Sequence, residues 1–124
     1  MARLSRVGSV LALLAVSSVV LSSCGSGGAV ADARRSCVYV TKALSIERRS
    51  QQVGLSTSRR SSLRADALSE LLKGTPYAAA ATSIDGSWNP LMTAINEAER
   101  VPIPDLRDTL SRLCRIANSQ TPYV

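Results

Sequence analysis

Apolar residues recur three or four positions apart along most of this chain, and this spacing is the feature that most constrains its fold. In the first such segment, Ala33, Cys37, Val40 and Leu44 are four, three and four residues apart. The same period returns in the later segments, whereas the longest strand candidate is Val38–Val40. The sequence therefore predicts an all-α fold with an aliphatic core, because the chain contains no Phe.

Turn signals divide residues 32–120 into four expected helices. The first begins near Asp32, and a Ser/Thr-rich stretch around Gly54 separates it from the second. The second covers about 58–73 and is followed by Gly74, a typical residue at a helix end.

The third and fourth helices are separated by a proline-rich turn. We favour one long helix, Pro76–Arg100, kinked near Pro90; two shorter helices with Asn89 capping the second are the alternative. Pro102 and Pro104 then impose an extended turn before the last helix. Four such helices with short connections predict a small up-down-up-down four-helix bundle.

The first 23 residues have the layout of an export signal. Two arginines in Met1–Arg6 precede the uncharged segment Val7–Ser23, which is short and serine-rich for a membrane span. At its end, Leu21-Ser22-Ser23-Cys24 resembles the lipobox of bacterial lipoproteins. This resemblance implies removal of residues 1–23, acylation of the Cys24 thiol, and a lipid anchor on the extracytoplasmic face of the cell membrane. An ordinary cleaved signal and an uncleaved anchor are the alternatives.

The resemblance also sets the expected domain organisation. Residues 1–23 are the signal peptide, 24–31 are the lipidated cysteine and a flexible Gly/Ser linker, and 32–120 are the helical domain.

Only Lys42 and Lys73 are lysines, and every other cation is arginine, which is typical of GC-rich genomes. This codon bias favours an actinobacterial origin for the expected lipoprotein.

With Cys24 assigned to lipid, Cys37 and Cys114 remain as an even pair in an oxidising compartment. Cys37 lies early in the first expected helix and Cys114 lies late in the last, and these ends meet in the predicted bundle. We predict a Cys37–Cys114 disulfide; two buried free thiols are the alternative. A metal site is not expected, because no histidine or third thiol completes one.

The chain contains no histidine, and this absence removes the commonest general base. No nucleophile stands in a recognisable motif, and no glycine-rich phosphate loop follows a strand. We therefore expect a protein that is not an enzyme and needs no cofactor. Nucleic acid is not an expected partner, because the chain carries an export signal and lacks interleaved aromatic residues.

Paired arginines are the most visible polar feature of a chain with a formal net charge of +6. One hypothesis is contact with anionic lipid headgroups, and the alternative is solvated surface. The six residues concerned are Arg34, Arg35, Arg48, Arg49, Arg59 and Arg60.

The expected kink supplies the other candidate surface. A kinked helix can open a groove, and the hypothesis places Tyr77, Trp88 and Asn89 at a binding surface there. The alternative is that Trp88 belongs to the core. The favoured function is a membrane-anchored binding module for an unidentified envelope protein or ligand. An envelope structural protein lying on anionic lipid is the main alternative, and an unrecognised envelope enzyme is a further one.

Overall fold

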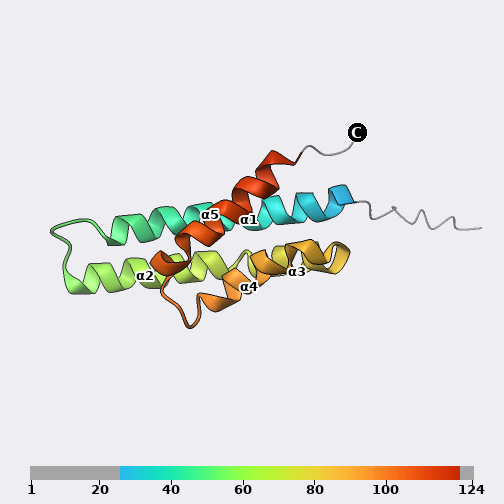
Figure 1. The fold of residues 1–124 in the computed structure, drawn as a ribbon. Helices are drawn as coiled ribbons and strands as arrows, with labels where there is room; N and C mark the ends of the chain where they lie inside the picture. The colour runs from blue at the N-terminus through green and yellow to red at the C-terminus, as the bar shows by residue number, and fades with distance from the viewer. Residues whose placement is uncertain (1–25, 121–124) are drawn as a thin grey trace, which may run out of the picture.

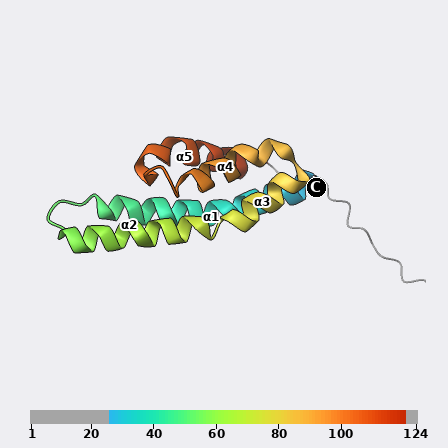
Figure 2. The ribbon, with the colours of Figure 1, turned by 90° about the horizontal axis from the view of Figure 1, so that it is seen from below.

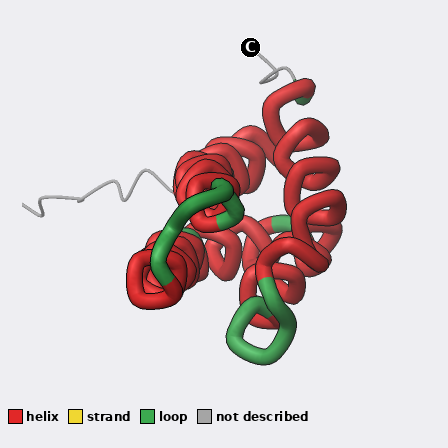
Figure 3. The backbone as a smooth tube through the Cα atoms, turned by 90° about the vertical axis from the view of Figure 1, so that its left-hand side faces the viewer, coloured by secondary structure: helices red, strands yellow, loops and turns green. Residues whose placement is uncertain are grey.

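The computed structural model describes residues 26–120, and this part of the chain is helical apart from short connections (Figures 1 and 3). Because no strand occurs between residues 26 and 120, the predicted all-α class is confirmed. The elements in chain order are α1 Ser26–Ser50, α2 Thr57–Leu72, α3 Thr75–Ile84, the 3-10 helix η1 Gly86–Trp88, α4 Asn89–Glu97 and α5 Ile103–Ser119.

The helices form four roughly straight segments, here called legs, in two layers: α1 is the first leg, α2 and α3 together are the second, α4 is the third and α5 is the fourth. α2 and α3 follow one another in nearly the same direction and return together along α1 (Figure 1). α4 then runs back beside α3, and α5 crosses α1 obliquely. Figure 2 shows α4 and α5 as a second layer over α1 and α2. The legs are therefore arranged up-down-up-down, but the second leg consists of two helices and Gly74 does not reverse the chain.

The single long helix favoured for Pro76–Arg100 is wrong, because the chain reverses after α3. Asp85 is extended (φ −141°, ψ 108°), and its carboxylate accepts a hydrogen bond from the backbone N–H of Ser87 at 2.9 Å, which caps η1. Pro90 lies in the first turn of α4, where a helix tolerates a missing N–H. The two-helix alternative is correct in outline. Trp88, however, occupies the N-cap position, and Asn89 is the first residue of α4.

The predicted flexible linker is also corrected, because α1 begins at Ser26 and not near Asp32. Ala29 and Val30 are buried in the core, and a Cβ added at Gly28 would lie 3.7 Å from Cδ1 of Ile84 at the end of α3. Packing of small residues against α3 thus outweighs the low helix propensity of glycine. The predicted linker residues before Ser26 lie outside the described part of the chain.

The core is aliphatic apart from Trp88 and the two cysteines Cys37 and Cys114, and it includes side chains from every helix. Its largest fully buried apolar residues are Val40, Leu71, Leu91, Ile95 and Leu110. The predicted disulfide is present between Cys37 of α1 and Cys114 of α5, with a Cα–Cα distance of 5.5 Å. None of the helices within residues 26–120 is both long and apolar enough to cross a membrane.

Candidate functional site

An open pocket of about 320 Å³ lies on the face where α1 meets α2 and α3. α1 supplies four of its residues, Arg35, Val38, Tyr39 and Lys42, which stand at positions i, i+3, i+4 and i+7. This spacing places them on one side of the helix, next to the buried stripe that includes Cys37 and Val40. α2 contributes Glu70, and α3 contributes Tyr77. The pocket therefore combines an aromatic pair, an exposed aliphatic side chain and several charges.

The two tyrosines form the apolar part of this pocket. The rings of Tyr39 and Tyr77 stack with their centroids 5.8 Å apart and an angle of 12° between their planes. Both residues are half-buried, and Val38 beside them is 65% exposed. A rigid aromatic surface with a polar rim is a common feature of binding sites.

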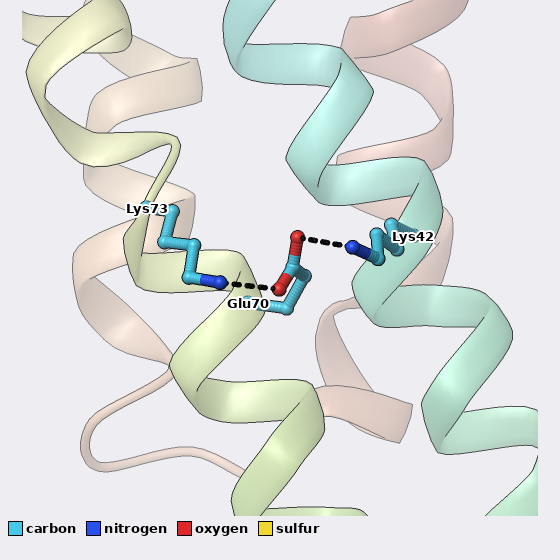
Figure 4. Close-up of polar contacts among 3 residues, drawn as sticks. All are labelled: Lys42, Glu70 and Lys73. Atoms are coloured by element: carbon cyan, nitrogen blue, oxygen red, sulfur yellow. Dashed lines mark hydrogen bonds and ion pairs between the residues drawn. The ribbon is translucent and has the colours of Figure 1, made fainter.

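Glu70 carries the charge network of the pocket (Figure 4). Its two carboxylate oxygens point to different lysines: Oε1 lies 3.1 Å from Nζ of Lys42, and Oε2 lies 2.9 Å from Nζ of Lys73. The Glu70 side chain is only 9% exposed, whereas those of Lys42 and Lys73 are 64% and 56% exposed. These are the only two lysines of the chain. A single buried carboxylate thus fixes the positions of both ammonium groups at the protein surface.

The contacts shift the ionisation of both partners. Hydrogen bonds from Lys73 and then from Lys42 hold the pKa of the Glu70 carboxyl below its usual value. The hydrogen bond to Glu70 raises the pKa of Lys73. Near neutral pH the carboxyl is therefore ionised and Lys73 is protonated. Arg35 makes no ion pair within residues 26–120, so cations outnumber anions at this site.

The joint between α2 and α3 positions Glu70 and Tyr77 against α1. The Ser36 hydroxyl, fully buried on α1, donates a hydrogen bond to the carbonyl oxygen of Gly74 at 3.0 Å. A Cβ at Gly74 would lie 3.1 Å from the carbonyl oxygen of Ser36. The absence of a side chain at Gly74 therefore permits this close approach of the two legs.

The predicted surface around the kink does not form. Trp88 is 4% exposed and belongs to the core, as the alternative interpretation held, whereas Asn89 is exposed. Tyr77 lies near the start of α3, and Trp88 follows the end of that helix. Of the three residues, only Tyr77 contributes to the pocket. Apart from Arg35, which was a candidate for a different reason, its neighbours there were not predicted from the sequence. The signal that could have found those on α1 is the i, i+3, i+4, i+7 spacing of Arg35, Val38, Tyr39 and Lys42 beside the core stripe.

The six paired arginines do not form one patch. Nε of Arg34 donates a hydrogen bond to the carbonyl oxygen of Ala117 at 2.9 Å, and the guanidinium donates a second one to the carbonyl oxygen of Gln120. Arg34 therefore caps the end of α5. Arg35 lies in the pocket. The other four flank the α1–α2 loop at the opposite end of α1 (Figure 1): Arg48, Arg49, Arg59 and Arg60. The hypothesis that the paired arginines contact anionic lipid headgroups therefore stays a prediction, and only for the four arginines beside the α1–α2 loop.

Within the described residues, no group of three or more His, Cys, Asp or Glu side chains is placed to hold a metal ion. Comparisons with models of protein families, with curated proteins and with solved structures give no match. Cys24, the predicted lipidation site, lies outside the described residues.

Proposed function

We propose that the chain is a membrane-anchored extracytoplasmic lipoprotein that acts as a non-enzymatic binding module. The pocket between α1, α2 and α3 is its ligand site, and the ligand is an anion that carries an aromatic or other apolar group. The observation that carries this proposal is the stacked Tyr39–Tyr77 pair next to Arg35 and Lys42. The tyrosines would contact the apolar part, and the guanidinium of Arg35 can donate paired hydrogen bonds to a carboxylate or phosphate.

The charges favour binding over catalysis. Lys42 and Lys73 both pair with Glu70, and the raised pKa of Lys73 keeps its amine protonated. A protonated lysine is neither a base nor a nucleophile, and the chain has no histidine to take that role. The two ammonium groups therefore serve as fixed positive charges.

The proposed anchor would hold the pocket close to the membrane. With Cys24 acylated, only about 7 Å of extended chain separates it from Ser26, where α1 begins. The pocket residues Arg35 to Lys42 lie within about 25 Å of Ser26 along the helix axis, at 1.5 Å per residue. A ligand of the cell envelope, present near the membrane surface, fits this placement.

The alternative of an envelope structural protein lying on anionic lipid is less well supported. Four of its six arginines are at the α1–α2 loop, at the far end of α1 from the proposed anchor. Arg34 is engaged with the end of α5. Anionic vesicles would bind the chain in a salt-sensitive manner if this alternative held.

The proposal is tested by binding of 1-naphthyl phosphate, an aromatic anion, to the full chain in non-ionic detergent, with 1-naphthol as the uncharged control. We expect saturable binding that Arg35→Ala and Tyr77→Ala each weaken about tenfold or more. Arg49→Ala is the matched control, because Arg49 is an exposed arginine of α1 outside the pocket. Equal effects of Arg35→Ala and Arg49→Ala, or equal affinity for 1-naphthol, would contradict the proposal.

A further inference from the structure

The pocket that contains Tyr39 and Tyr77 is called the tyrosine pocket below. A second, separate pocket lies where α1 and α2 meet the connection between α4 and α5. Its volume is about 380 Å³, within the range of small-molecule sites. Its walls are mostly apolar and consist of Leu68, Ala98, Pro102, Ile103 and Pro104. Two charged residues complete the lining: Glu47 of α1 and Arg64 of α2. The proposed function makes no use of this pocket.

Glu47 is the unusual member of this set. Its residue is only 2% exposed, yet it makes no ion pair with any residue of the described chain. The Ser50 hydroxyl, also fully buried, lies 3.1 Å from Glu47 Oε1 and 2.6 Å from the Glu47 carbonyl oxygen. An ionised carboxylate can accept about four hydrogen bonds, so one shared hydroxyl leaves most of its capacity unfilled.

A buried carboxylate without a cationic partner lowers the stability of a fold, because the charge has lost its hydration. Lys42 and Lys73 illustrate the usual compensation at Glu70, the other buried glutamate of this helical core. Glu47 lines an open pocket, so a ligand could supply the missing cation. The aliphatic walls would then contact the carbon chain behind the cationic group. Lysine side chains in proteins are packed in the same way, with their methylenes against apolar surface and the ammonium group in a polar environment.

From this geometry we infer that the second pocket binds the ammonium group of a small aliphatic amine, with Glu47 as the charge partner and the apolar walls along the carbon chain. Arg64 is exposed on the wall of the pocket and selects for the far end of the ligand. It repels a second cation there and attracts a carboxylate. The preferred ligand is therefore an aliphatic amine that ends in a carboxylate, and not a diamine.

The first test measures binding of n-pentylamine and 1-pentanol to the full chain in non-ionic detergent by calorimetry at pH 7.5. The amine is protonated at this pH, and the alcohol has a similar shape without the charge. We expect one saturable site for pentylamine and binding of pentanol weaker by about tenfold or more. Because this comparison needs no variant, equal affinity for the two compounds overturns the inference directly.

Variants then locate the site. Glu47→Gln keeps the shape and the acceptor for Ser50, and it should weaken pentylamine binding about tenfold or more. Asp108→Asn is the matched control, since it removes one exposed carboxylate of α5 outside the pocket. Circular dichroism checks that each variant is folded, and Glu47→Asp provides a second variant that keeps the charge. Equal losses in Glu47→Gln and Asp108→Asn would mean that the amine binds elsewhere.

The role of Arg64 is tested with 6-aminohexanoate and 1,5-diaminopentane. The unaltered chain should prefer the former by about fivefold or more, and Arg64→Gln should remove this preference. A strong gain of pentylamine affinity in Arg64→Gln would show instead that Arg64 itself pairs with Glu47 in solution, which overturns the inference. N-acetyl-lysine methylamide distinguishes the source of the amine: binding as tight as pentylamine indicates a lysine residue of a protein, and weaker binding a free amine.

Discussion

The hydroxyl of Ser36 on α1 donates a hydrogen bond to the carbonyl oxygen of Gly74, which lies between α2 and α3, at 3.0 Å. Both residues are buried, so this contact fixes the second leg of the bundle against the first at its joint. Glu70 and Tyr77 lie on either side of the joint, and both belong to the tyrosine pocket. The close approach of the two backbones is therefore a condition for the pocket.

Gly74→Ala should destabilise the protein by about 1–3 kcal/mol, because an added Cβ meets backbone that cannot move freely. The nearest atoms would be Ser36 Oγ at 3.0 Å, the Ser36 carbonyl oxygen at 3.1 Å and the Leu71 carbonyl oxygen at 3.2 Å. Gly86→Ala is the matched control, with no atom within 4 Å and an expected effect within about 0.5 kcal/mol. Urea unfolding of both variants measures the difference. Equal stabilities would show that the joint is looser than described.

The Cys37–Cys114 disulfide closes a loop of 77 residues. In the chain-entropy account, its removal by Cys37→Ala and Cys114→Ala together should lower the free energy of unfolding by about 4.5 kcal/mol. Urea unfolding of the double variant and the unaltered chain, both under oxidising conditions, gives this value. Adding a reductant should shift only the unaltered chain, and a reductant effect on both would point to a different cause.

The Glu70 network predicts a pH dependence of stability with a defined sign. The folded-state pKa of Glu70 is lowered, first by Lys73 and then by Lys42, so its contribution is complete above about pH 4.3 and is lost as the pH falls through the folded pKa. The pKa of Lys73 is raised by Glu70, so its contribution is complete below about pH 10.4 and is lost as the pH rises through the folded pKa.

Glu70→Gln should remove both effects. The difference in unfolding free energy between this variant and the unaltered chain should be constant between about pH 5 and pH 10 and should shrink outside that window. Denaturant titrations across the pH range measure it. Glu99→Gln is the control, because Glu99 is exposed and makes no ion pair within residues 26–120. Identical pH profiles for the two variants would contradict the network.

The early start of α1 is tested by one substitution at two nearby positions. Ala29 is fully buried, and Ala31 is exposed on the same turn. Ala29→Asp should cost about 3 kcal/mol or more because it buries an unpaired charge, whereas Ala31→Asp should be nearly neutral near the N-terminal end of a helix. Thermal unfolding compares the two. If both variants were equally stable, this segment would behave as the flexible linker that the sequence first suggested.

The helices were predicted correctly because they depend on the local spacing of apolar residues. The disulfide was predicted correctly because Cys37 and Cys114 stand at helix positions that meet in a bundle. The prediction of one long helix was wrong at the reversal after α3. The three- and four-residue spacing of apolar residues continues through Ala81, Trp88 and Leu91 although the backbone turns between α3 and α4. A periodic pattern reports which residues are buried and not whether they share one helix. The extended Asp85 and the position of Pro90 decide that question locally.

The tyrosine pocket could not be predicted for a related reason. The exposed residues of α1 and the pair Glu70 and Lys73 are visible as helix-surface patterns. Their meeting depends on α3 continuing α2 in line, so that Tyr77 reaches Tyr39. That arrangement follows from the buried joint at Gly74, a tertiary contact between segments 38 residues apart.

The proposed location of the protein rests on Cys24, and intact-mass spectrometry of the chain purified from bacterial membranes tests it most directly. The account predicts a polypeptide that begins at Cys24 and carries diacylglycerol on its thiol, with Met1–Ser23 removed. An unmodified Cys24, or a chain that retains Met1–Ser23, would contradict it.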